Sequence, residues 1–190
     1  MRKLFALIAA LALVVTIMAP AGAGNRFKRL GEDPPADSAP TLDIAFLDVG
    51  RGGILTDGRT IPALEIHIGL HSMVPPTGGI PDVPAYEWVF TVRSRTFIAE
   101  GVAGRTPRFF LFELFDDGSL EQLEDPVGTF DESDGFIRIS VPLSTIGARR
   151  GTVISGADET EGGGDVDSHV HHAGTSYVDV MTTTKDFVVP

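Results

Sequence analysis

The chain has 190 residues, with 15 Lys and Arg against 26 Asp and Glu, and a formal net charge of −11. So acidic a chain repels nucleic acid and anionic membrane surfaces, which excludes both as expected partners. It contains no cysteine, and this excludes disulfides, lipid attachment through cysteine and cysteine-based catalysis.

The N-terminus has the three-part pattern of a secretory signal peptide. Arg2 and Lys3 precede an uncharged, apolar run over residues 4–19, and a proline and the small residues of 21–23 follow. We expect a signal peptide spanning residues 1–23, because the apolar run is shorter than the roughly 17 to 25 residues of a spanning helix. Retention as an uncleaved anchor is the alternative. The sequence therefore predicts a secreted or extracytoplasmic protein without membrane contact after cleavage.

Residues 24–40 mix a small basic cluster with acids and prolines and show no period of 2 or 3.6. This composition predicts a flexible linker between the cleavage site and the folded domain. The folded domain is then expected to span residues 41–190.

A two-residue period begins after residue 41. Apolar and polar residues alternate over 42–46 and again over 64–70, with Asp57-Gly58 between the two runs. An Asp-Gly pair between apolar runs predicts a two-residue β-hairpin, because both of its residues tolerate positive φ. Residues 71–84 hold four prolines and a glycine pair, which predict a long irregular loop.

The next segments also have the patterns of strands. Residues 86–92 alternate with the most aromatic face in the chain, and 96–102 are the expected hairpin partner. Residues 109–115 are apolar on both faces except at Glu113, which predicts a central strand covered on both sides. Trp88 is the only tryptophan, and its place in an alternating strand favours a role in the core over ligand binding.

The clearest unit lies within residues 129–157. Residues 137–141 alternate as a half-buried strand does, 143–147 form a single turn closed by glycine, and 152–154 resume an extended run. Further strands are expected near 120–123, 127–130, 177–180 and 187–189. The whole pattern predicts an all-β fold, namely an antiparallel, jelly-roll-like sandwich of two sheets with about ten short strands and no long helix.

Three stretches give this pattern a family likeness: Tyr86-Glu-Trp-Val-Phe-Thr-Val92, Gly135-Phe-Ile-Arg-Ile-Ser-Val-Pro-Leu-Ser-Thr-Ile-Gly147 and Gly151-Thr-Val-Ile154. They resemble the closing half of the DOMON-like and family 9 carbohydrate-binding-module-like β-sandwiches. The resemblance implies a sandwich that binds sugars or, in some branches, haem, and that lacks catalysis of its own. Haem-binding members use a Met and a His as ligands, and the available candidates do not match those positions: Met73, Met181, His67 and His71.

The densest polar cluster lies in the acidic, histidine-containing stretch 160–174, which is predicted to be a loop. If its second half is extended, His169 and His171 point the same way about 7 Å apart, so both could reach one transition metal together with Asp167 or Asp165. The carboxylates could instead wrap Ca²⁺. A solvated acidic loop with incidental histidines is the competing interpretation. His67 and His71 stand about 13 Å apart on their strand, too far to share an ion.

Catalysis is not expected. The acidic turns at Asp57, Asp116-Asp117 and 131–135 are explained by hairpin chemistry, and Glu113 is expected to pair with an arginine such as Arg93 or Arg108. Ser144 has no base nearby in the sequence, and a G-x-S-x-G motif and phosphate loops are absent.

The leading hypothesis is a secreted, non-catalytic module that recognises an extracellular ligand, with carbohydrate as the candidate class. Its expected recognition surfaces are the loops of residues 72–84 and 160–174. One alternative is a structural or adhesive envelope protein that binds other proteins. Another is a metal-binding extracellular domain that uses Asp165, Asp167, His169 and His171.

Overall fold

The computed structural model describes residues 27–35, 42–72, 83–104, 106–157, 165–171 and 176–190, with the side chains at 169–171 and 176–178 left out. The described chain contains strands only, and the antiparallel two-sheet sandwich predicted from the sequence is confirmed. In chain order the strands are β1 (Phe27–Glu32), β2 (Ile44–Thr56), β3 (Arg59–Leu70), β4 (Val83–Val92), β5 (Arg95–Val102), β6 (Arg108–Leu114), β7 (Leu120–Gln122), β8 (Val127–Asp131), β9 (Phe136–Pro142), β10 (Val153–Gly156), β11 (Val166–His171), β12 (Ser176–Met181) and β13 (Phe187–Val188).

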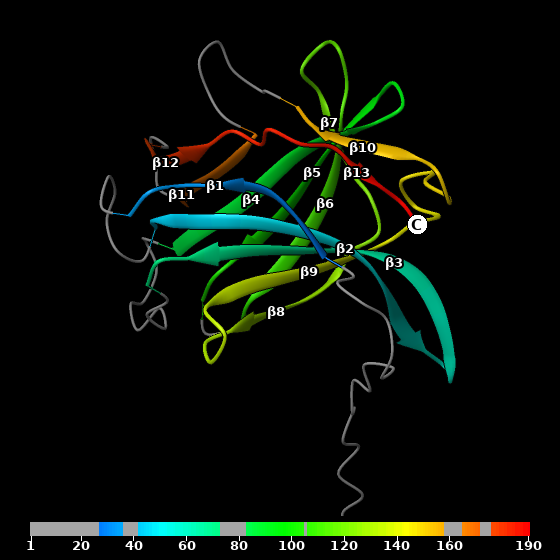
Figure 1. Ribbon diagram of the computed structural model, residues 1–190, viewed down its shortest axis with the longest axis horizontal. Coiled ribbons are helices and arrows are strands. Elements are labelled where there is room, and N and C mark those ends of the chain that lie inside the picture. Colours follow the sequence, from blue (N-terminus) through cyan, green and yellow to red (C-terminus); the bar gives the residue numbers. More distant parts are fainter. Residues whose placement is uncertain (1–26, 36–41, 73–82, 105, 158–164, 172–175) are drawn as a thin grey trace, which may run out of the picture.

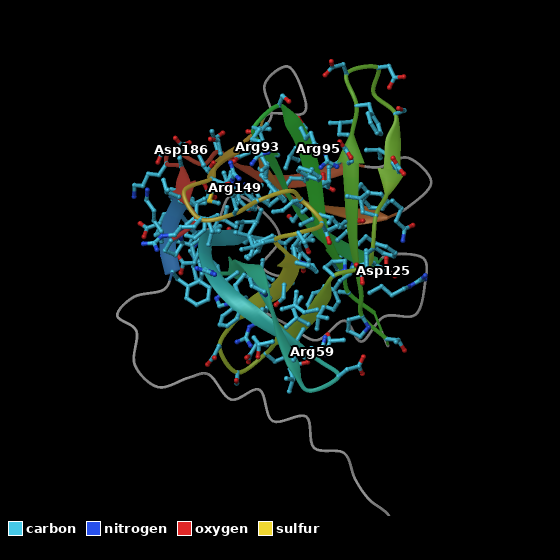
Figure 2. The ribbon with its side chains drawn as sticks, turned by 90° about the vertical axis from the view of Figure 1, so that its right-hand side faces the viewer. Arg59, Arg93, Arg95, Asp125, Arg149 and Asp186 are labelled. Atoms are coloured by element: carbon cyan, nitrogen blue, oxygen red, sulfur yellow. The ribbon has the colours of Figure 1, made fainter. Side chains whose placement is uncertain are left out.

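The two sheets form two layers (Figure 1). The five-stranded sheet has the order β1-β2-β3-β9-β8, and the eight-stranded sheet runs β12-β11-β4-β5-β6-β7. Strands β10 and β11 share one edge of β4, where β10 pairs with its C-terminal part and β11 with its N-terminal part, and β13 pairs with β10. Turned by 90°, the structure shows charged side chains around the outside of the layers (Figure 2).

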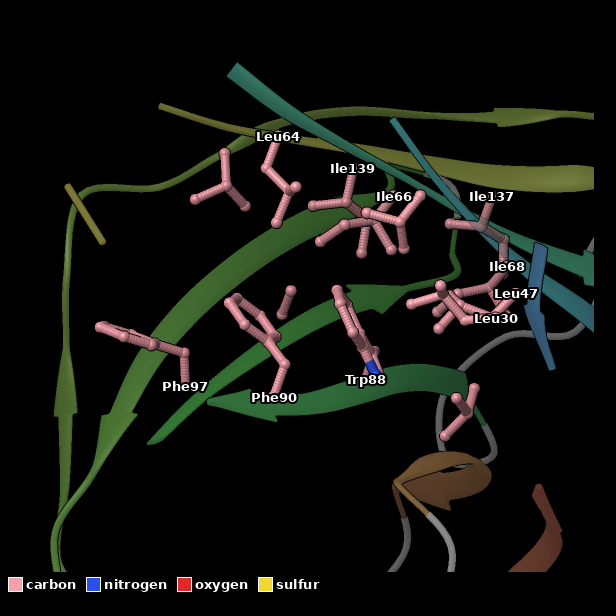
Figure 3. Close-up of a cluster of buried hydrophobic side chains, with 14 of the residues drawn as sticks. Leu30, Leu47, Leu64, Ile66, Ile68, Trp88, Phe90, Phe97, Ile137 and Ile139 are labelled. Atoms are coloured by element: carbon pink, nitrogen blue, oxygen red, sulfur yellow. The ribbon is translucent and has the colours of Figure 1, made fainter. Parts of the chain in front are cut away.

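The core lies between the layers. Trp88, Phe90 and Phe97 project from the eight-stranded sheet toward aliphatic side chains of the five-stranded sheet, such as Ile66 and Ile139 (Figure 3). All five side chains are fully buried, and the rings of Trp88 and Phe90 stack at 4.5 Å. Trp88 therefore packs in the core, as its alternating strand predicted.

The predicted hairpins are present. Asp57 and Gly58 both have positive φ, 50° and 74°, and join β2 to β3 in unbroken register from that turn back to Phe46. These φ values fit the type I′ turn that an Asp-Gly pair favours. Strand β2 continues through residues 50–53, three of which are glycines.

The linker prediction for residues 24–40 is wrong over Phe27–Glu32, which form β1 at the edge of the five-stranded sheet. Leu30 is fully buried in the core, and Thr184 donates its amide to the Leu30 carbonyl at 3.0 Å. One buried leucine and a full row of backbone hydrogen bonds to β2 are enough to order this polar segment. Within residues 1–26 and 36–40, the predicted signal and linker lie outside the described residues.

The expectation of a loop over residues 160–174 is wrong at Val166–His171, which form β11. This strand pairs on both sides, with β4 and with β12, and Val166 and Ser168 are fully buried. Strands such as this bring the number in the described part of the chain to thirteen, against the expected ten or so. The rest of that stretch, and residues 73–82 of the predicted proline-rich loop, lie outside the described residues.

The prediction that residues 109–115 are covered on both sides is wrong in degree. Strand β6 lies between β5 and β7, but Leu111 is its only fully buried residue, because the described structure has two sheets and no third layer covers the outer face of β6. Within the described ranges, no helix has the length and apolar character needed to span a membrane.

Candidate functional site

Asp165 and Asp167, half of the metal set predicted from the sequence, are buried beside β4. The carboxylate of Asp165 accepts hydrogen bonds from the Trp88 indole Nε1 at 3.2 Å and from the Thr183 amide at 2.5 Å, and a third from the Thr183 hydroxyl. It thus joins β4 to the segment after β12. His169 and His171 have their backbones in β11, but their side chains lie outside the described part, so the metal set stays a prediction.

Another acidic group gathers where the end of β1 and the start of β2 meet β12. Asp33, Asp43 and Asp179 each place a carboxylate oxygen within 4.8 Å of the others. Asp179 also accepts a hydrogen bond from the Ile44 amide at 2.6 Å, and both Asp43 and Asp179 are buried. Three carboxylate oxygens at this spacing are a donor set that suits a hard cation such as Ca²⁺. The sequence could not reveal the group, because its members are far apart along the chain.

The outer face of the five-stranded sheet carries the most organised cluster of functional side chains. Alternation along each strand turns Leu47, Ile66 and Ile137 into the core and their neighbours outward. Because the strands are in register, the outward residues lie side by side. We call this surface the aromatic face, and it comprises Phe27, Arg29, Phe46, Asp48, Glu65, His67, Phe136 and Arg138.

Three rings stack across this face. The centroid of the His67 ring lies 4.2 Å from that of Phe27, with 28° between the planes, and 4.3 Å from that of Phe136, with 14° between the planes. Such face-to-face packing fixes the imidazole between two phenyl rings. Phe27 is 37% exposed, so one side of the stack faces solvent.

Glycines make room for the larger groups of the aromatic face. A Cβ at Gly69 would lie 2.2 Å from the Phe46 ring, and one at Gly52 would lie 2.2 Å from the Glu65 side chain. Both side chains therefore lie flat over glycine backbone on a neighbouring strand. A methyl group at either position would displace them.

A bidentate ion pair between β1 and β2 lies on the aromatic face. Arg29 donates from Nε and Nη2 to the two carboxylate oxygens of Asp48, at 2.5 and 2.9 Å, and its guanidinium lies 3.9 Å from the centroid of the Phe46 ring. The hydrogen bond to Asp48 raises the pKa of Arg29. The fork geometry holds both charges in place on the surface.

The polar groups in the middle of the aromatic face are poorly satisfied. Burial, and then the charge of Arg138, lower the pKa of His67 to about 4, so the imidazole is neutral at pH 7. Its Nε2 atom is buried without a hydrogen-bond partner among the described residues, as is the Nε atom of Arg138. The nearest carboxylate oxygen, from Glu65, is 4.0 Å away, and burial raises the pKa of that carboxyl.

The two strand histidines do not share a site, as their spacing predicted. His67 stacks within the aromatic face, whereas the Nε2 atom of His71 lies 3.0 Å from the Asp33 carbonyl oxygen. Sequence reasoning missed Phe27 as a site residue because it assigned that position to the linker. Phe27 and Arg29 point outward and Leu30 points into the core, but this alternation is too short to indicate a strand from the sequence.

Glu113 and Asp117, two of the carboxylates that the sequence analysis explained without catalysis, both have hydrogen-bond partners. Glu113 pairs with Arg95, at 2.6 and 2.5 Å, rather than with Arg93 or Arg108, and this hydrogen bond lowers the pKa of Glu113. Asp117 accepts hydrogen bonds from the amide and hydroxyl of Ser119 within its turn.

The aromatic face thus offers rings, a neutral imidazole and fixed charges, which suit it to binding. Comparison with models of known families, with curated proteins and with solved structures gives no match to this chain.

Proposed function

We propose that the chain is an exported, non-catalytic recognition module that binds carbohydrate at its aromatic face. The observation that carries the proposal is the stack of Phe27, His67 and Phe136, surrounded by hydrogen-bonding groups that are already fixed in position. The proposed recognition surface is the outer face of the five-stranded sheet, and not the loops of residues 72–84 and 160–174 that the sequence suggested.

The chemistry of a sugar ring suits this surface. A pyranose has an apolar C–H face, which packs on aromatic carbon, and hydroxyl groups at its rim, which exchange hydrogen bonds with carboxylates and guanidinium groups. Phe27 is the most accessible ring, and the Arg29 and Asp48 pair lies beside it on β1 and β2. Buried His67 Nε2 and Arg138 Nε lack partners within the described structure, and a water that bridges them to a ligand would satisfy them.

The resemblance to carbohydrate-binding sandwiches supports the same ligand class. The acidic net charge of the chain favours neutral over anionic glycans as ligands.

The test uses purified residues 24–190 on an array of neutral glycans, followed by isothermal titration calorimetry with the best ligand. Phe27→Ala is expected to weaken binding at least tenfold, because it removes the exposed ring of the stack. Phe115→Ala is the matched control, since Phe115 is 41% exposed at the end of β6, on the other sheet.

Absence of retention on every neutral glycan would overturn the proposal, and so would equal losses in the two phenylalanine variants. Concentration-dependent assembly in light scattering without any glycan would instead favour a structural or adhesive protein.

A further inference from the structure

A shallow cleft of about 540 Å³ opens on the outer face of the eight-stranded sheet, where β4 and β10 pair. We call it the arginine cleft, and its polar lining is formed by Thr91, Arg93, Arg149, Arg150, Thr152 and Ser155. Among the described residues, no acidic side chain lines it. In a chain of net charge −11, three cations without an anion among the described lining residues are an exception to the overall charge.

Arg93 enters the cleft from a strained turn. Val92 pairs with Arg95, so Arg93 and Ser94 form a two-residue hairpin loop between β4 and β5. Arg93 has a φ of 60°, and Ser94 is not among the positive-φ residues. A loop with positive φ at its first position favours glycine there, because a Cβ is disfavoured in that conformation. The chain therefore holds a cation at a position where its backbone prefers glycine, and such outliers cluster at functional sites.

Arg149 and Arg150 come from a turn that is fixed at several points. The Thr152 hydroxyl accepts a hydrogen bond from the Arg149 amide at 3.0 Å, and the Thr152 amide donates to the Arg149 carbonyl at 2.8 Å. The Gly151 amide donates to the carbonyl of Val189 at 2.8 Å, which ties the turn to the segment after β13. The backbone of these two arginines is therefore held in place before any ligand arrives.

The three guanidinium groups have no ion pair within the described structure, whereas Arg29 and Arg95 each hold a carboxylate. Arg93 and Arg149 lie on the same part of the surface, apart from Arg59 at the tip of the β2 and β3 hairpin (Figure 2). Converging arginines without counter-ions are the usual recognition element for oxyanions, which they bind through paired N–H donors.

We propose that the arginine cleft binds a phosphate or sulfate group carried by a small molecule. The guanidinium groups hold the oxyanion, and the hydroxyl of Ser155 supplies a further donor. The Thr91 hydroxyl donates to the Ser155 carbonyl at 3.5 Å and so lies beside it in the lining. Val153, which is 47% exposed and also lines the cleft, contacts the carbon skeleton of the ligand. The volume fits a group of sugar size rather than a bare ion. This inference does not rest on the proposed function, because its site lies on the other sheet.

The test is a titration followed by backbone amide chemical shifts, which detects the millimolar affinity expected for exposed charges. The probes are inorganic phosphate, glucose 6-phosphate, glucose 6-sulfate and unmodified glucose. We expect saturable shifts at Gly151, Thr152 and Val153 with the three anions and none there with glucose. Tighter binding of the sugar esters than of inorganic phosphate identifies a sugar-borne oxyanion as the ligand, and equal binding identifies the free oxyanion.

Two variants remove charges from the cleft and carry different risks to folding. Arg93→Gly relieves the positive φ and is expected to weaken the binding of glucose 6-phosphate at least tenfold. The double variant Arg149→Gln, Arg150→Gln is expected to weaken this binding further. Arg59→Gln is the matched control, because it makes the same change of charge at the hairpin tip.

Three results would overturn the inference. They are no saturable binding of any anion, shifts spread over arginines outside the cleft, and equal weakening by Arg59→Gln and Arg93→Gly. The last would mean that net charge alone attracts the anion.

Discussion

The two outer faces of the sandwich use the same kinds of side chain in opposite ways. On the aromatic face, Arg29 is paired with Asp48 and stacked on Phe46, and His67 is enclosed between two rings. In the arginine cleft, the guanidinium groups are exposed, and the fixed element is the backbone that carries them. The aromatic face should therefore contribute to stability as well as binding, and the cleft to binding alone. Five predictions test this contrast.

The largest effect is expected from Phe136→Ala on the aromatic face. The substitution removes one wall of the His67 stack and leaves a gap over β9, which we expect to lower the free energy of unfolding by about 2 to 3 kcal/mol. Urea denaturation measures this loss. Arg149→Gln in the cleft, as the counterpart, should change the same quantity by less than about 0.5 kcal/mol. Equal losses in the two variants would remove the contrast.

The pH dependence of stability gives the next largest effect. The pKa of His67 is lowered to about 4, so between the ordinary histidine value and about pH 4 the unfolded chain binds a proton that the native chain does not. Stability is therefore lost as the pH falls through that range, by about 2 kcal/mol at pH 5 on account of this residue. His67→Phe keeps the stack and cannot titrate, so the gap between variant and wild type should widen as the pH falls.

Glu65 acts in the opposite sense in the same experiment. Burial raises its pKa, so the native carboxyl takes up a proton more readily than the unfolded one, and its contribution grows as the pH falls. Glu65→Gln should accordingly steepen the loss seen in the wild type. A gap between His67→Phe and wild type that is constant from pH 7.5 to pH 5 would show that His67 titrates normally.

The sequence predicted the sandwich fold better than the two binding surfaces. In strands such as 137–141, apolar and polar residues alternate along the strand, so this alternation and the turn residues were sufficient to predict the fold. Phe27 belongs to a strand with only one fully buried apolar side chain, and its order depends on pairing with β2. The Arg93 and Arg149 juxtaposition depends on β10 joining the edge of β4. Such pairings between distant segments are not encoded in local periodicity.

Stability should rise slightly, or stay unchanged, in Arg93→Gly. Glycine adopts a φ near 60° without the steric cost that a side chain carries, and this gain of about 1 kcal/mol is offset in part by the greater freedom of glycine in the unfolded chain. Thermal unfolding compared with Ser94→Gly, where φ is not positive, isolates the effect of the conformation. A loss of more than about 1 kcal/mol in Arg93→Gly would mean that the arginine is there for folding rather than for binding.

The smallest effect is the coupling energy between Glu113 and the arginine with which it forms an ion pair. Arg95 takes both carboxylate oxygens of Glu113, and Arg93, two residues away, has no ion pair within the described structure. A double-mutant cycle with Arg95→Gln and Glu113→Gln should give a coupling energy of about 0.5 kcal/mol that falls in high salt, as expected of a partly exposed pair. The same cycle between Arg93 and Glu113 should give none. Coupling of similar size in both cycles would mean that Arg93 shares the carboxylate in solution, and the arginine cleft would then lose one of its three free cations.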